Sequence, residues 1–241
     1  MLRQLAKGIR DLLYPEICLA CRDTIKGQGE ETHICPGCFN KIKLNIPPFC
    51  SVCGRHLENL KAHKNICPQC LKSSFSFDRA FAPCSYEGVI KELIHEFKYK
   101  GKMRLARPLS SLMIAYIREY GFPIRYIDYI IPVPLSATRL REREFNQAEV
   151  LSRQLSAAYG KNILDRALIR HRHTQSQTDL EEAERRENIR GSFKVAEPLA
   201  VKNRNLLLID DVLTTGATSS EAAQALKEAG ANIVFVLTLA S

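Results

Sequence analysis

Four Cys-x-x-Cys pairs near the start of the chain constrain its fold more than any other feature. Each cysteine of the first two pairs recurs 32 residues later. Two such turns brought together offer the tetrahedral cage of four thiolates that Zn²⁺ prefers. The spacing therefore predicts two copies of one small zinc unit, produced by a tandem duplication. The paired cysteines are Cys18/Cys21, Cys35/Cys38, Cys50/Cys53 and Cys67/Cys70.

Disulfides and a dithiol redox site are the rival interpretations of these cysteines. Disulfides are rare in the cytosol, and the start of the chain lacks the apolar run of a secretory signal. A redox site needs only one pair, within a thioredoxin-like pattern. We therefore expect two structural zinc ions, held by residues 18/21/35/38 and 50/53/67/70, although the spacing also allows an interleaved cross-brace. His33, His56 and His63 lie among the cysteines and are expected to be surface residues.

A change of composition after Cys70 predicts two domains. Residues 1–76 would hold an amphipathic N-terminal helix and the double zinc ribbon, a segment too short and polar to fold without metal. Residues 77–241 alternate apolar strand patterns with helical ones, which predicts a parallel sheet covered by helices on both faces. The ninth cysteine, Cys84, lies in an expected strand and is interpreted as a buried, inert thiol.

The expected elements of this second domain follow from the spacing of apolar residues. The strands are expected at 79–86, 128–134, 205–209 and 233–239. The helices are expected at 88–100, 103–120, 137–159 and 219–229. Residues 171–190 are highly charged and are interpreted as a loop or a flap.

An acidic loop rich in threonine follows the strand expected at 205–209. Open α/β sheets bind ligands at the carboxyl ends of their strands, and a helix N-terminus favours an anion. Thr218 or Ser219 would cap the helix. Two adjacent carboxylates, Asp210 and Asp211, are costly beside a phosphate unless ligand hydroxyls or Mg²⁺ use them. The residues expected to face the phosphate are Thr214, Thr215, Gly216, Ala217 and Thr218.

Residues 209–218 resemble the binding motif for phosphoribosyl pyrophosphate (PRPP) in type I phosphoribosyltransferases. The resemblance implies that fold for the second domain, a parallel sheet flanked by helices. It also implies that Thr214–Thr218 hold the 5′-phosphate of PRPP, that Asp210 and Asp211 hold its ribose hydroxyls, and that Mg²⁺ accompanies PRPP. No residue is assigned a catalytic role, and the acidic pair provides the best candidates.

The wider resemblance is to ComF-type competence proteins and covers nearly the whole chain. It is carried by the paired cysteines and by residues 95–102, 132–135, 145–147 and 172–193. One departure concerns Arg143-Glu144-Phe145-Asn146-Gln147, where the family usually has Gly in second place. A positive φ is costly for Glu144, so the local geometry here is open.

Several basic residues are candidates for binding the pyrophosphate group. Arginine binds phosphate oxygens in a bidentate way, and a flap of basic residues could close over the ligand. Arg141 belongs to the same stretch as Arg139 and Arg143, and Arg170, Arg172, Arg186 and Arg190 accompany Arg185 in the flap. The main candidates are Lys98, Arg139, Arg143 and Arg185.

The net charge of +9 suits a polyanionic partner. No apolar run approaches the roughly 20 residues of a membrane span, which predicts a cytoplasmic protein, with the inner face of the membrane as one location. The family resemblance implies a role in natural transformation, with single-stranded DNA and the DNA-uptake machinery as partners. Three functions stay open: a Mg²⁺-dependent phosphoribosyltransferase, a non-catalytic DNA-binding factor, and a protein-interaction platform.

Overall fold

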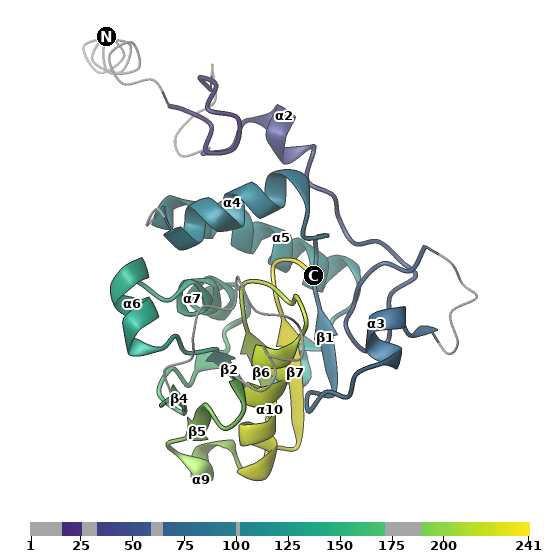
Figure 1. Cartoon of the computed structure of the whole chain (residues 1–241), viewed down its shortest axis with the longest axis vertical. Coiled ribbons are helices and arrows are strands. Elements are labelled where there is room, and N and C mark those ends of the chain that lie inside the picture. The colour runs from purple at the N-terminus through teal and green to yellow at the C-terminus, as the bar shows by residue number, and fades with distance from the viewer. Residues whose placement is uncertain (1–15, 26–32, 59–64, 100–101, 172–188) are drawn as a thin grey trace.

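The computed structural model describes residues 16–25, 33–58, 65–99, 102–171 and 189–241 (Figure 1). Several sequence predictions lie outside these residues. They are the N-terminal helix, His63, the end of the helix expected at 88–100, and the flap with Arg185.

A five-stranded parallel sheet forms the centre of the molecule, in the order β1-β7-β6-β2-β3. The parallel α/β fold predicted for this part of the chain is thereby confirmed. The apolar run at 205–209 is a strand over its whole length, and its neighbours on both sides bury its backbone. The strands are β1 (Arg79–Phe81), β2 (Tyr129–Pro132), β3 (Asn162–Ile163), β6 (Asn205–Ile209) and β7 (Ile233–Leu237).

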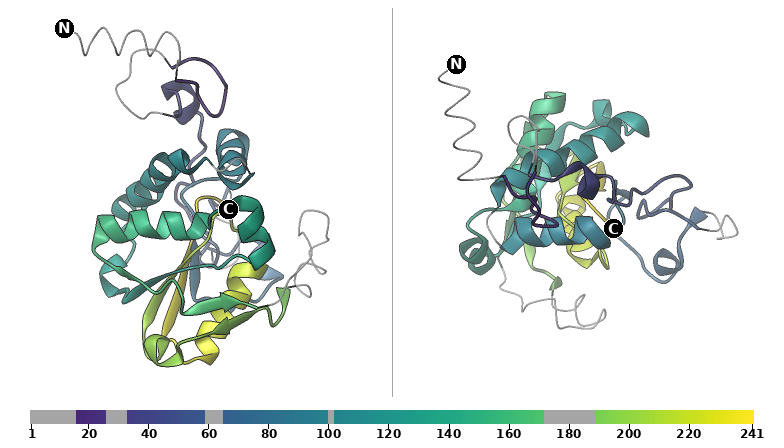
Figure 2. Two further views of the ribbon diagram at one scale, coloured as in Figure 1. Left: turned by 90° about the vertical axis from the view of Figure 1, so that its left-hand side faces the viewer. Right: turned by 90° about the horizontal axis from the view of Figure 1, so that it is seen from above.

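Helices cover both faces of this sheet, and the alternation along β6 shows which face each one covers (Figure 2). Leu207 and Ile209 belong to the core shared with α4 (Gly88–Tyr99), α5 (Ala106–Glu119) and α7 (Gln147–Tyr159). Leu206 and Leu208 belong to the opposite core, shared with α10 (Ala217–Glu228). Cysteines of the first ribbon join the former core and those of the second ribbon join the latter. The first copy therefore joins the core that contains α4 and α5, and the second copy joins the core that contains α10.

The long helix predicted at 137–159 is wrong, because two helices occupy this stretch. α6 (Ala137–Arg143) ends at Glu144, whose backbone is left-handed with a φ of 67°. Asn146 then caps α7, since its side-chain oxygen accepts a hydrogen bond from the Ala148 N–H at 3.1 Å. The Asn146 amide also donates to the Val133 carbonyl, which anchors the start of α7 beside the end of β2. The stretch 145–147 is therefore a helix start.

We expect Glu144→Gly to stabilise the protein by about 0.5–1 kcal/mol, because glycine adopts a positive φ without the steric cost that glutamate incurs. The Glu144 side chain is exposed, so little packing is lost. Chemical denaturation of both proteins measures the difference. An equal or lower stability of the variant would show that this turn is not strained.

Smaller differences concern the ends of elements and short pieces. The strand predicted at 79–86 stops at Phe81, and Cys84 makes only isolated bridges with Leu44 and Ala240. Cys84 is buried as predicted, and this burial raises the pKa of its thiol to about 12. The helix predicted from residue 103 begins as the 3-10 turn η2 (Met103–Leu105). Three short elements were not predicted, namely η3 (Ile124–Tyr126), α9 (Pro198–Val201) and β3.

An antiparallel pair, β4 (Leu168–Arg170) with β5 (Phe193–Val195), stands apart from the main sheet and was also not predicted. Its two strands flank the segment that the sequence predicts to be a flap. Arg170 is the last residue of β4, and its guanidinium lies over the Phe193 ring at 5.5 Å from the centroid. None of the helices in the described part of the chain is long and apolar enough to cross a membrane.

Candidate functional site

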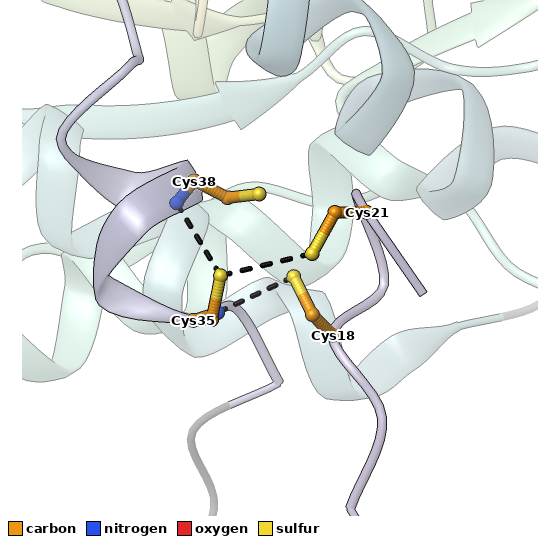
Figure 3. A group of neighbouring side chains, drawn as sticks. All are labelled: Cys18, Cys21, Cys35 and Cys38. Atoms are coloured by element: carbon orange, nitrogen blue, oxygen red, sulfur yellow. Dashed lines mark hydrogen bonds between the residues drawn. The ribbon is translucent and has the colours of Figure 1, made fainter. Parts of the chain in front are cut away.

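The eight paired cysteines form two clusters with the geometry of zinc sites, and Figure 3 shows the first of them. Within each cluster the sulfur atoms lie within 4.8 Å of one another. Cys21 and Cys35 Sγ are 3.8 Å apart, and Cys53 and Cys67 Sγ are 3.7 Å apart. A zinc ion bound tetrahedrally at about 2.3 Å needs sulfurs about 3.8 Å apart, whereas a disulfide needs about 2.05 Å. The clusters are 18/21/35/38 and 50/53/67/70, which is the sequential pairing and not the cross-brace.

The two clusters share their backbone geometry, as expected for a duplication. The second pair of each cluster begins a short helix, α2 (Pro36–Phe39) or α3 (Pro68–Leu71). The N–H of Cys35 donates to Cys18 Sγ at 3.3 Å, and the N–H of Cys67 donates to Cys50 Sγ at the same distance. Burial raises the pKa of the Cys18 thiol, but backbone hydrogen bonds outweigh this effect and lower it to about 6. Backbone N–H groups therefore favour the thiolate form of Cys18, the form that binds zinc.

The purified protein is expected to contain two zinc ions per chain. Elemental analysis measures the content, and thiol titration before and after addition of a strong chelator shows whether the cysteines hold the metal. One zinc ion or none, with cysteines that stay unreactive after denaturation without reductant, would indicate disulfides instead.

The acidic threonine loop lies at the carboxyl end of β6, where the sequence predicts it. Its chain runs from Asp210, whose N–H donates to the Leu237 carbonyl, to Gly216 at the start of α10. The predicted cap by Thr218 or Ser219 is wrong, because the helix begins at Ala217 and Gly216 occupies the cap position. Gly216 has no side chain to offer the first turn, and Thr215 Oγ1 accepts from the Ala217 N–H at 3.4 Å. This start is suited to an anion that accepts from backbone N–H groups.

Gly216 is needed for a reason that the sequence does not reveal. Its φ is 76°, and a Cβ at this position would lie 2.6 Å from Cε1 of Phe75. The Phe75 ring stacks on Phe77 and closes one side of the loop. A side chain at residue 216 would therefore disturb this packing first.

The acidic pair has partners within the chain. Asp211 Oδ1 lies 2.7 Å from Lys98 Nζ, and its Oδ2 lies 3.9 Å from Arg143 Nη1. Asp210 Oδ1 accepts a hydrogen bond from the Asp211 N–H at 2.8 Å. The positive charges of Lys98 and Arg143 therefore offset the electrostatic repulsion between the two adjacent carboxylates.

The two carboxyl groups differ in their readiness to ionise. Burial, and next the charge of Asp211, raise the pKa of Asp210 to about 7. The Asp211 N–H, Lys98 and Arg143 act in the opposite direction without offsetting the rise. Asp210 therefore changes charge near neutral pH, which is typical of groups at functional sites.

A cavity of roughly 390 Å³ collects most of the predicted ligand-binding residues. Those that line it are Lys98, Arg139, Arg143, Arg170, Asp210, Asp211, Thr214 and Thr218. Thr215, Gly216 and Ala217 complete the loop but do not line the cavity. Arg141 is exposed on α6 and does not line it either. A larger hollow of roughly 900 Å³ lies between the first ribbon and α7, and it holds neither the acidic pair nor the threonine loop.

Arginines crowd one wall of this cavity. Burial, followed by the charge of Arg143, lowers the pKa of Arg139. Burial and then Arg139 lower the pKa of Arg170 to about 10. Arg143 also lies over the Tyr99 ring, 5.3 Å from its centroid. Like charges held this close favour a multiply charged anion between them.

Two residues of the cavity wall, Tyr86 and Lys91, were not predicted from the sequence. Lys91 and Lys98 are seven residues apart on α4, and this spacing places them on one face of a helix. The spacing of the two lysines could therefore have predicted that Lys91 lies beside Lys98 at the site. Tyr86 follows Cys84 in an irregular segment, where no sequence pattern indicated a place in the cavity wall.

Three curated relatives match most of the chain. Competence protein F of Haemophilus influenzae is 32% identical over 229 residues, which is 92% of this chain and 96% of the relative. DNA utilization protein YhgH of Escherichia coli O157:H7 is 31% identical, over 86% of this chain and 96% of the relative. Competence protein ComFC of Bacillus subtilis is 27% identical, over 82% and 79%. A double zinc ribbon domain family matches residues 9–71.

Solved structures of two larger enzymes are similar to part of the chain. One is the glutamine PRPP amidotransferase from B. subtilis in complex with ADP and GMP, at 19% identity and a TM-score of 0.35. The match covers 58% of this chain and only 26% of that enzyme. The other is the allosteric regulatory enzyme of purine biosynthesis, at 24% identity and a TM-score of 0.30, over 46% and 21%.

Proposed function

The chain belongs to the ComF family of competence proteins, and on this premise we propose that it binds PRPP with Mg²⁺ in the cavity beside Asp210 and Asp211. One observation carries the proposal. A single cavity gathers an acidic pair, two threonines of a helix-start loop and a crowded group of cations. PRPP presents hydroxyls, a monophosphate and a pyrophosphate, and each of these groups has a matching partner here.

Each part of PRPP is assigned to one part of the cavity. The 5′-phosphate would lie against the loop Thr214–Thr218, where the start of α10 favours an anion. The ribose hydroxyls would donate to Asp210 and Asp211. The pyrophosphate would be bound by Arg139, Arg143 and Arg170, whose mutual repulsion an anion relieves.

Magnesium fits the acidic pair, because Mg²⁺ is usually held by one or two carboxylates together with ligand phosphates. When bound, it would neutralise charge on the pyrophosphate. The residues of this chain would orient the sugar and stabilise charge on the departing group while an acceptor attacks the anomeric carbon. The reaction class is phosphoribosyl transfer, with the phosphoribosylated acceptor and pyrophosphate as products.

PRPP is expected to bind at micromolar to submillimolar concentration in the presence of Mg²⁺, and more weakly without the metal. Isothermal titration calorimetry measures both affinities. A screen of acceptor bases for pyrophosphate release then tests catalysis. Absence of binding at millimolar PRPP would exclude this ligand and the enzyme function with it.

A role in handling single-stranded DNA is the second candidate function, in line with the names of the relatives. The net charge of +9 favours it. The larger hollow offers Arg104, Arg107 and Arg153 beside Phe145, although three glutamates also line it and Glu149 pairs with Arg153. Phosphate contacts of this kind weaken steeply with salt, and aromatic rings stack on bases. Affinity for an oligonucleotide at two salt concentrations tests this role. An affinity independent of salt would contradict it.

Each of the two predicted domains is assigned one role. We propose residues 1–76 as the zinc ribbon unit and residues 77–241 as the unit that binds PRPP. We place the protein in the cytoplasm, at the inner face of the membrane, where it would meet incoming DNA and the uptake machinery. Fractionation of cells with an antibody against the chain tests this location.

A further inference from the structure

The two zinc ribbons share their cysteines but differ in the residues between them. The second ribbon reads Cys53-Gly54-Arg55 where the first reads Cys21-Arg22-Asp23. Gln69, in the second turn of the second ribbon, corresponds to Gly37 in the first. Arg55 and Gln69, whose side chains can donate hydrogen bonds, therefore have no equivalent at the corresponding positions of the first ribbon.

Arg22 of the first ribbon contacts helix α4. This residue has a φ of 69°, and its guanidinium lies 2.5 Å from Glu96 Oε1 on α4. The Glu96 side chain is only 7% exposed, so the contact reaches into the protein. Glu96 lies on α4, so this contact does not involve the threonine loop.

The second ribbon lies against the edge strand β1, and Gly54 takes the position there that Arg22 takes in the first ribbon. Gly54 has a φ of 73°, and a Cβ there would lie 2.7 Å from the Ala80 carbonyl oxygen. The Ala80 N–H donates to the Val52 carbonyl at 2.7 Å. This close approach brings the neighbouring Arg55 to the threonine loop.

Arg55 and Gln69 bind the backbone of that loop. Arg55 Nη2 donates to the carbonyls of Leu213 and Thr214 at 3.2 Å and 3.1 Å. Gln69 Nε2 donates to the Thr214 carbonyl at 3.4 Å, and its side-chain oxygen accepts from Arg55 Nη1. The ribbon thus holds two consecutive peptide carbonyls with side chains that also hold each other.

The segment after the ribbon supports the other end of the loop. The Phe75 ring lies against Gly216, and the Ser76 N–H donates to Ser220 Oγ at 3.0 Å. The loop is therefore held from the second ribbon at residues 213–214 and from residues 75–76 at the start of α10.

The held carbonyls determine where the donors of the loop point. A peptide unit is planar and trans, so its N–H points opposite to its carbonyl. With the carbonyls of Leu213 and Thr214 directed at the ribbon, the N–H groups of Thr214 and Thr215 point away from it. We propose that Arg55 and Gln69 are positioning residues for the phosphate loop, which makes the second ribbon, and not the first, the support of anion binding. This inference rests on the proposed binding of a 5′-phosphate by that loop.

The test uses the full, zinc-loaded chain and two ligands that divide PRPP into its parts. Ribose 5-phosphate probes the threonine loop, and pyrophosphate probes the arginines. Arg55→Ala is expected to weaken ribose 5-phosphate binding about tenfold and to leave pyrophosphate binding within about twofold. Arg55→Lys, which keeps one donor, is expected to fall between wild type and Arg55→Ala.

Asp23→Ala is the matched control, because Asp23 occupies the position of Arg55 in the first ribbon. It is expected to leave the affinity for both ligands unchanged. Zinc content of two per chain and an unshifted thermal melt check that each variant is folded.

The outcomes separate this inference from the function on which it rests. Equal affinity of wild type and Arg55→Ala for ribose 5-phosphate would overturn the positioning role alone. Equal losses for both ligands would also overturn it, since they would indicate general damage to the fold. If wild type does not bind ribose 5-phosphate, the assignment of the phosphate loop is wrong and the inference falls with it.

Discussion

Replacing Asp210 and Asp211 together with alanine is expected to lower the affinity for PRPP about a hundredfold or more. Each carboxylate would lose a charge-assisted hydrogen bond to a ribose hydroxyl, and such bonds contribute about 1.5–3 kcal/mol each. Calorimetric titration of wild type and variant with PRPP and Mg²⁺ measures the loss.

Pyrophosphate is the matched ligand for this experiment. It lacks the ribose, so in the absence of Mg²⁺ the variant is expected to bind it at least as well as wild type, because Arg139, Arg143 and Arg170 remain in place. A variant that binds PRPP as wild type does would show that the acidic pair does not contact the sugar.

The same variant is expected to be less stable than wild type. From the sequence, adjacent carboxylates look like a burden whose removal is harmless. In the structure, Lys98 and Arg143 face Asp211, and their side chains are only 16% and 9% exposed. Removing a carboxylate from such a group leaves buried positive charge unbalanced, which costs stability. Thermal melts of both proteins are therefore a necessary control.

Asp210 adds a dependence on pH to this prediction. The pKa of its carboxyl is raised to about 7, first by burial and then by Asp211. The ionised form is the one that accepts from two hydroxyls, so PRPP affinity is expected to rise as the pH increases through 7. Asp210→Asn cannot ionise and is expected to lack this rise, apart from the share that the ligand phosphates cause.

Local patterns were sufficient for the parts of the fold that depend on short stretches of chain. Strand β6 has five residues, and the four after Asn205 are apolar. A run of this kind is typical of a parallel strand that is buried between two neighbouring strands. The cysteine spacing predicted both zinc clusters because each turn brings two thiolates together within four residues.

The break between α6 and α7 shows where local patterns fail. Apolar and polar residues continue in helical spacing through residues 137–159, yet Glu144 takes a left-handed backbone that its residue type disfavours. The Asn146 amide that anchors the start of α7 reaches Val133, which lies 13 positions earlier. Tertiary contacts of this kind override propensity and leave no mark on the helix itself.

The candidate site was predictable in its loop and less so in its surroundings. Residues 210–218 are contiguous, so their motif could be recognised. The contact of Lys98 with Asp211 and that of Arg55 with Thr214 join residues far apart in the chain. The fold brings these pairs together, and sequence spacing contains no information on them.

Gly54→Ala is expected to destabilise the protein by about 3 kcal/mol or more, the largest effect on stability among the changes considered. Two costs combine at this position. The φ of 73° disfavours any side chain, and the new Cβ would lie 2.7 Å from the Ala80 carbonyl oxygen and 2.9 Å from Phe81 Cα. Both atoms belong to the backbone of β1, which is paired with β7 and cannot move aside without disturbing the sheet.

Gly121→Ala separates the two costs. Gly121 also has a positive φ, of 62°, but a Cβ there meets nothing within 4 Å. This control is expected to lose about 1 kcal/mol, from the backbone conformation alone. Chemical denaturation of the three proteins, each loaded with zinc, measures both differences. If the two variants were equally stable, the second ribbon could leave strand β1 without cost, and its contact with the threonine loop through Arg55 would not be a fixed part of the fold.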